Sequence, residues 1–274
     1  MLTYTITTSR NQFHKIPEQN RQFQIMPVRT GFVRPDFKVP SHSNLKSHIL
    51  LHTGYDINPF SPSIFNPADY QALLLKSYLD ACPGVDELLI HGPDKPSTLR
   101  YFDAGLTIIK TYSESVPEIK IGIEMPAFCK SMYSEGIVNQ SNAFDFALSY
   151  FNNIIKFGFE IIIDTAHLFS NGLTTSQICD LLTIFKDNYT YIHLNGNANS
   201  GFKKDKHTTL TPHPNFPQNQ IPDADQLLSC VAALMNEGKI CISEQKCSDL
   251  NYFKHLSTQF GFKINEGIPS ELII

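Results

Sequence analysis

The sequence predicts an α/β fold of one barrel, in which eight parallel strands alternate with helices, the (β/α)₈ or TIM barrel. Two observations support this fold class. The chain has 274 residues, a length typical of one such barrel. Eight short runs rich in Ile, Val, Leu and Phe also alternate with longer stretches of helical periodicity. That alternation is the pattern of repeated βαβ units around a parallel sheet, and we expect residues 1–274 to form a single domain.

The expected strands are the short apolar runs, and they cover Leu2–Thr7, Gln22–Met26, Ser47–Leu51, Glu87–Ile90, Lys120–Ile123, Glu160–Ile163, Tyr189–Ile192 and Lys239–Ile242. Helical periodicity, often beginning at a Ser, Thr or Asp cap, predicts helices at Pro67–Ala81, Ser97–Tyr112, Ser141–Phe157, Thr174–Asp187, Asp223–Glu237 and Ser248–Phe260. Three segments rich in polar residues and proline are expected to be loops, Thr8–Arg21, Pro27–Lys46 and Asn195–Pro222. The last is long enough to suggest a functional loop.

Composition limits the classes of protein that fit. Apolar residues make up 42% of the chain and charged residues 18%, which suits one sizeable core and argues against disorder. The formal net charge is −4, so no excess of Lys and Arg indicates a nucleic-acid partner. Bound metal ions that meet phosphates would weaken this objection, because they bring positive charge to the anion.

The six cysteines are scattered, with no C-x-x-C pair. This spacing favours free thiols in a reducing compartment over a disulfide framework or a cysteine-based zinc site. The first residues lack a signal-peptide pattern, and no apolar run approaches the roughly 20 residues that span a membrane. We therefore expect a soluble intracellular protein of the cytoplasm or nucleus, neither secreted nor membrane-bound.

Residue types that bind metals recur where the expected strands end. The six positions are His52, His91, Glu124, Asp164, His193 and Glu244. In a (β/α)₈ barrel the carboxyl ends of the strands meet at one mouth, where active sites are built. His167 follows Asp164 by three residues, and Asp205 and His207 are two apart, so each pair can present both side chains on one side.

Taken singly, each of these residues has a structural explanation. A histidine at the end of a strand is often part of the core, and Asp164 before Thr165 has the sequence of a helix N-cap. Glu124 fits a buried carboxylate satisfied by hydrogen bonds. These explanations do not account for six such residues at one barrel end, where carboxylates and imidazoles need metal ions to offset desolvation and repulsion.

The ligand set indicates the metal. Imidazole nitrogen together with carboxylate oxygen suits zinc, and to a lesser degree manganese or iron. Nine residues exceed what one four-coordinate zinc requires. They suit a cluster of two or three ions with shared carboxylates, an arrangement used for in-line phosphoryl displacement.

In this order the residues resemble the endonuclease IV family of apurinic/apyrimidinic (AP) endonucleases. The resemblance spans about Ser47 to Gln245. It rests on the motifs H-T-G-Y at His52, L-I-H-G-P at His91, I-E-M-P at Glu124, I-D-T-A-H-L-F-S-N-G at Asp164 and His167, H-L-N at His193, D-K-H-T-T-L at Asp205 and His207, and the terminal-strand Glu244. The chain departs from the family pattern after the bridging glutamate, at Met125-Pro126, and after H-L-N, at Gly196.

The resemblance implies a xylose-isomerase-like, endonuclease IV-like TIM barrel that holds three zinc ions, with manganese an alternative at one site. It assigns His52, His91 and Glu124 to the first ion. It assigns Glu124, Asp164, His193 and Glu244 to the second, and His167, Asp205 and His207 to the third.

The activity it implies is zinc-dependent hydrolysis of the phosphodiester 5′ to an abasic site in DNA base-excision repair, leaving a 3′-OH. Glu124 and Glu244 would be catalytic, and Tyr55, Lys206 and Arg29 would contact DNA. The expected partner is damaged double-stranded DNA and the expected state a monomer. Two alternatives stay open: a sugar isomerase or epimerase on a related metal-binding barrel, and a non-catalytic barrel that metal stabilises.

Overall fold

The computed structural model describes residues 2–7, 22–26, 48–53, 57–61, 75–76, 85–197, 207, 210, 221–244 and 250–265. Within these ranges, parallel strands form a closed barrel in the order of the chain, β1 to β8, and β1 also pairs with β8. The strands are β1 Leu2–Thr7, β2 Gln22–Met26, β3 His48–His52, β4 Glu87–His91, β5 Lys120–Glu124, β6 Glu160–Asp164, β7 Tyr191–His193 and β8 Ile240–Ser243.

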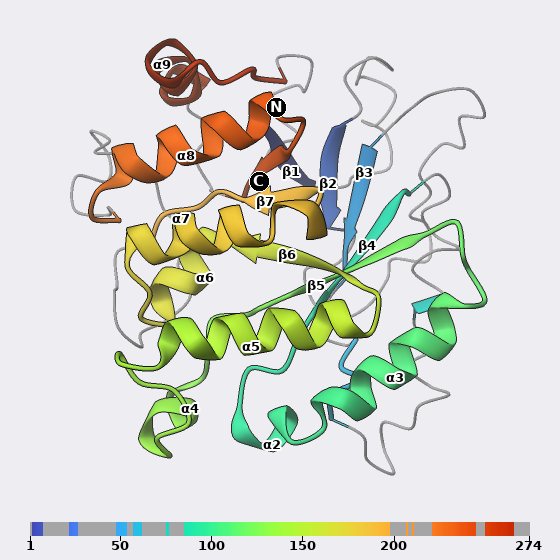
Figure 1. Ribbon diagram of the computed structural model, residues 1–274. Helices are drawn as coiled ribbons and strands as arrows, with labels where there is room; N and C mark the ends of the chain where they lie inside the picture. The colour runs from blue at the N-terminus through green and yellow to red at the C-terminus, as the bar shows by residue number, and fades with distance from the viewer. Residues whose placement is uncertain are drawn as a thin grey trace.

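Helices follow the strands from β4 onward and lie outside them (Figure 1). They are α2 Pro96–Leu99, α3 Phe102–Ser113, α4 Lys130–Ser134, α5 Ala143–Lys156, α6 Thr165–Ser170, α7 Thr175–Ile184, the 3₁₀ turn η3 Lys186–Asn188, α8 Ala224–Asn236 and α9 Leu250–Phe260. The connections after β1, β2 and β3 lie largely outside the described residues, although Leu75 and Lys76 are helical. The described elements form a TIM-barrel-like α/β fold.

The alternation of side chains along the strands divides the core into two parts. A small cluster fills the barrel interior: Leu50, Leu89, Ile162, Tyr191, Ile240 and Ile242. Their neighbours in sequence point the other way, because successive strand residues face opposite sides. Thus Leu88 and Ile90 flank Leu89 and belong to the larger cluster between strands and helices.

The structure differs from the expected boundaries in ways that have local causes. Most strands include the residue predicted to follow them, so His52, His91, Glu124, Asp164 and His193 are strand-terminal residues. The predicted helix Ser97–Tyr112 is two helices, α2 and α3, separated at Arg100 and Tyr101. The short helices α4 and α6 were not predicted, because five or six residues carry too little periodicity.

Other features agree with the expectations. Helices α5, α7, α8 and α9 fall within the predicted ranges, and Thr174 caps α7 with its side chain accepting the N–H of Gln177. Every described helix is too short or too polar to cross a lipid bilayer.

Helix α3 approaches Phe60, in the segment after β3, through a glycine. A Cβ atom built on Gly105 would lie 2.2 Å from Cδ1 of Phe60, whose ring is fully buried and packs edge-on against Phe102. No side chain larger than hydrogen fits there without displacement of the ring.

We predict that Gly105→Ala lowers the free energy of unfolding by about 1–3 kcal/mol, the usual cost of overpacking a close-packed core. Thr107→Ala, on the exposed face of the same helix, serves as the control and should change it by no more than about 0.5 kcal/mol. Urea unfolding measures both. Equal stability of Gly105→Ala and the unsubstituted protein would contradict the packing described.

Candidate metal centre

Side-chain alternation places the predicted ligands inside the barrel mouth. His52 lies two residues after the interior residue Leu50, and His91 lies two after Leu89. The same spacing relates Ile162 to Asp164, Tyr191 to His193 and Ile242 to Glu244. The parallel register then brings neighbours together, with Glu124 opposite His91 and His193 opposite Asp164.

Glu124 lies at the centre of this arrangement, with no exposed surface. Its Oε1 atom lies 3.0 Å from Nδ1 of His193 and 3.4 Å from Nδ1 of His167. Its Oε2 atom faces the other side, 3.1 Å from Nε2 of His91 and 4.0 Å from Nε2 of His52. The two carboxylate oxygens therefore point to two different sets of imidazoles.

Three groups of side chains bring their nitrogen and oxygen atoms within 4.8 Å of one another, as a metal ion requires. They are His52 with His91 and Glu124, Glu124 with Asp164 and His193, and Asp164 with His167 and His207. Glu124 is shared by the first two groups and Asp164 by the last two. The three groups form one continuous cluster linked by carboxylates.

Asp164 uses its two oxygens differently. Oδ1 accepts the backbone N–H of His167 at 2.9 Å and caps helix α6, so the N-cap interpretation of the sequence holds. Oδ2 accepts a hydrogen bond from Asn195 Nδ2 at 2.9 Å and lies 3.6 Å from both His193 Nδ1 and His207 Nε2. One oxygen serves the fold while the other faces the cluster.

Glu244, just after β8, is the third carboxylate of the cluster, beside Glu124 and Asp164. Its oxygens lie 3.3 Å from His207 Nδ1, 3.6 Å from His193 Nδ1 and 4.0 Å from His52 Nε2. Asn195 fixes the backbone here, because its Oδ1 atom accepts the N–H of Glu244 at 2.9 Å.

The remaining predicted residues, Asp205, Tyr55, Lys206 and Arg29, lie outside the described residues. The structure brings together eight of the nine predicted ligands: His52, His91, Glu124, Asp164, His167, His193, His207 and Glu244.

The electrostatics of the cluster prepare it for a cation. Burial, followed by repulsion from His91, lowers the pKa of His52 to about 4, which keeps its imidazole neutral at neutral pH. Burial alone would raise the pKa of Glu124, but the facing imidazoles of His193 and His167 lower it well below its usual range. Neutral imidazoles and ionised carboxylates are the forms that bind metals.

A divalent cation fits this donor set. The buried Oε2 atom of Glu124 receives no hydrogen bond from the described residues, although His91 Nε2 lies 3.1 Å away. A buried carboxylate oxygen without a donor is costly unless a cation satisfies it. Imidazole nitrogen and carboxylate oxygen are together the ligands of zinc and related transition metals.

Two buried amides around the ligands were not predicted as site residues. Gln24, in the middle of β2, hydrogen-bonds to His193 and Glu244, and Asn195 hydrogen-bonds to Asp164 and Glu244. The sequence signals were a polar residue at an interior position of an apolar strand, in Q-F-Q-I-M, and the asparagine of H-L-N.

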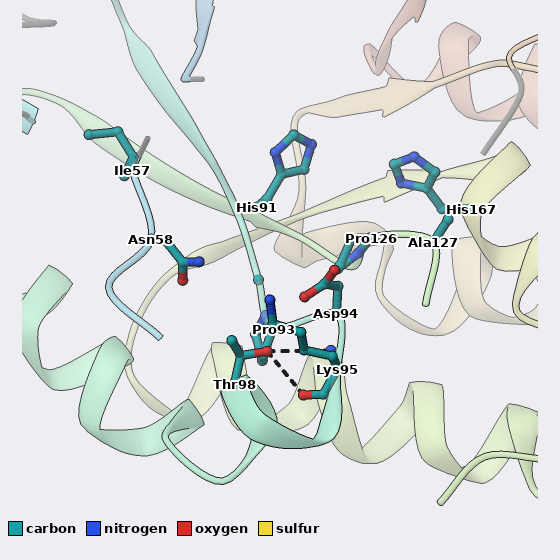
Figure 2. Close-up of a pocket in the computed structure, with 11 residues that line it drawn as sticks. Ile57, Asn58, His91, Pro93, Asp94, Lys95, Thr98, Pro126, Ala127 and His167 are labelled. Atoms are coloured by element: carbon teal, nitrogen blue, oxygen red, sulfur yellow. Dashed lines mark hydrogen bonds between the residues drawn. The ribbon is translucent and has the colours of Figure 1, made fainter. Parts of the chain in front are cut away.

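A pocket of about 380 Å³ adjoins the cluster. Figure 2 shows the imidazoles of His91 and His167 along one side, with Asn58, Asp94 and Lys95 among the residues that line the rest. Because His91 and His167 belong to different groups of ligands, a molecule in this pocket would border two of the three groups.

No protein-family model matches the sequence, and no curated protein matches it significantly. Solved structures similar in fold include the three that follow. A D-tagatose 3-epimerase-like protein is 16% identical with a TM-score of 0.57, over 94% of this chain and 96% of that chain. AsfvAP, solved as AsfvAP:AG, is 16% identical with a TM-score of 0.55, over 95% of this chain and 97% of that chain.

A xylose isomerase domain protein from Planctomyces limnophilus is 10% identical with a TM-score of 0.54, over 95% of this chain and 98% of that chain. At these identities the similarity concerns the fold alone. The chain therefore shares a TIM-barrel-like fold with these structures.

We predict that binding of a divalent cation releases a proton from His193. Burial alone would lower its pKa, but the carboxylates of Glu244 and Glu124 raise it well above its ordinary value. His193 is therefore protonated at neutral pH until a cation displaces the proton, so the apparent affinity should rise with pH by up to about tenfold per unit. Calorimetric zinc titrations in two buffers of different ionisation enthalpy count the protons released. Affinity that does not change between about pH 6 and about pH 8 would refute this prediction.

Proposed function

We propose that this chain is a zinc-dependent AP endonuclease of the endonuclease IV family, active in DNA base-excision repair. It hydrolyses the phosphodiester on the 5′ side of an abasic site and leaves a 3′-OH. The observation that carries the proposal is the sharing of Glu124 between two groups of ligands, and of Asp164 between two. In this proposal the chain is a single domain, a complete (β/α)₈ barrel, and acts as a monomer on damaged double-stranded DNA.

Shared carboxylates favour phosphodiester hydrolysis because they would hold cations close together. When bound, zinc ions would supply Lewis acidity at the phosphoryl group and lower the pKa of a water molecule. In the proposed assignment, His52, His91 and Glu124 hold one ion. Glu124, Asp164, His193 and Glu244 hold a second, and His167, Asp205 and His207 a third.

The residues of the chain have distinct roles in the proposed reaction. Glu124 and Glu244 orient the attacking water, one proton of which ends on the leaving 3′-oxygen. The water oxygen bonds to phosphorus as the bond from phosphorus to the 3′-oxygen breaks, which yields a 3′-OH and a 5′-phosphate. Tyr55, Lys206 and Arg29 contact the DNA around the lesion, where a single aromatic contact is typically worth about 1–3 kcal/mol.

The net charge of −4 is compatible with this substrate, because metal ions in the mouth would attract the phosphate. An abasic nucleotide lacks a stacked base, so it swings out of the duplex at lower cost than an intact nucleotide. The pocket of about 380 Å³ beside His91 and His167 lies where such a nucleotide would meet the cluster.

A sugar isomerase or epimerase is the second candidate, and the same pocket favours it. Its volume suits a small ligand, and the polar side chains of Asn58, Asp94 and Lys95 in its lining suit a polyol. Against it, sites of that class typically use mostly oxygen ligands, which suit the harder metals. The cluster instead offers five imidazoles, those of His52, His91, His167, His193 and His207.

The deciding test is incubation of the purified protein with a duplex that carries one abasic site. We expect a single cut 5′ to the site that a chelator abolishes and zinc restores, with an intact duplex as control. A parallel assay on keto-sugars should show no conversion. Sugar conversion without cutting would replace the proposal by the second candidate, and neither activity would indicate a non-catalytic barrel that metal stabilises.

We further predict that Glu124→Gln abolishes cutting and lowers bound zinc by at least one ion. The amide removes a shared anionic oxygen from two groups at once. Glu160→Gln is the matched control, at the opposite end of the barrel, where β6 begins and Glu160 contacts Lys120. It should keep both zinc and turnover. Elemental analysis and the cutting rate measure the outcome, and normal turnover by Glu124→Gln would refute the assignment.

A further inference from the structure

Gln24 is a fully buried amide on β2 that reaches across the barrel to the cluster. In the sheet it lies level with Leu50 of β3, an interior residue. Its Oε1 atom lies 2.7 Å from Nε2 of His193, and its Nε2 atom donates to Oε1 of Glu244. One side chain thus contacts two predicted ligands on β7 and just after β8.

The chemistry of the two partners fixes the orientation of this amide. An ionised carboxylate only accepts hydrogen bonds, so Glu244 must face the amide NH₂ group of Gln24. The amide oxygen then faces His193, and it can only accept. It follows that Nε2 of His193 carries a proton and donates a hydrogen bond to Oε1 of Gln24.

A proton held on Nε2 leaves Nδ1 as the nitrogen with a free lone pair in the neutral imidazole. Nδ1 of His193 lies 3.0 Å from Glu124 Oε1 and 3.6 Å from the nearest oxygens of Asp164 and Glu244. A lone pair that faces three carboxylates is unfavourable without a cation among them. Partners of this kind usually fix the tautomer and orientation of histidines that bind metals.

We propose that Gln24 is a positioning residue that holds the proton of His193 on Nε2 and directs Glu244, so that His193 offers Nδ1 to the metal. This role rests on the metal site of the proposed function but not on its substrate. Because Gln24 acts by orienting His193 and Glu244, we expect its replacement to change metal binding separately from folding.

Gln24→Met tests the role, because methionine has a similar length but neither accepts from His193 nor donates to Glu244. We expect its zinc affinity, measured by competition with a chromophoric chelator, to fall about 10- to 100-fold. We also expect the Nε2–H signal of His193 to disappear from histidine ¹H–¹⁵N spectra of the zinc-bound protein. Gln24→Glu keeps an acceptor for His193, so it should retain that signal even if Gln24→Met does not fold.

Glu87→Gln is the matched control. Glu87 is a buried polar residue at the other end of the barrel, where burial raises the pKa of its carboxyl well above the usual range. Its replacement should leave zinc affinity within about twofold and the His193 signal intact. For Gln24→Met, either an unchanged zinc affinity or a retained Nε2–H signal overturns the proposal, and so does loss of the signal in Gln24→Glu. These measurements need no DNA, so they stand apart from the test of AP endonuclease activity.

Discussion

The ionised carboxylate of Glu124, removed from water at the end of a barrel strand, is the constraint on which the rest of the site depends. An isolated buried carboxylate is strongly disfavoured. Imidazoles on two elements offset this cost at Oε1, His193 on β7 and His167 on α6, while His91 on β4 lies near Oε2. Each faces the mouth because of its place in a strand or in the first turn of a helix. The barrel thus positions the carboxylate of Glu124 between two groups of candidate ligands.

Amide side chains surround the candidate ligands and fix the orientation of their side chains. Gln24 and Asn195 each donate to one carboxylate and accept from an N–H group. Asn171 holds the segment after β5 in the same way, since its side chain accepts the N–H of Phe128 and donates to the carbonyl of Pro126. An amide with a donor on one side and an acceptor on the other cannot be reversed without loss of both bonds. The ligands are therefore held by groups of fixed polarity.

Much of the fold and of the candidate site could be predicted from the sequence because both depend on short-range patterns. The two-residue period of the strands and the residue type at each strand end are visible directly, as at His52 and Asp164. The division between α2 and α3 was not visible, because Arg100 and Tyr101 are compatible with a helix. Gln24 was missed for a different reason, since its partner His193 lies 169 residues away in the chain.

The two carboxylate oxygens of Asp164 place different demands on the residue at this position. Its Oδ1 atom caps α6, while its Oδ2 atom faces the imidazoles. Asparagine caps helices about as well as aspartate, so the helix alone would tolerate either residue. Only the charged oxygen on the other side distinguishes them. At a mouth without charged partners, asparagine would serve this position as well as aspartate, so the charge of residue 164 matters to the mouth and not to the helix.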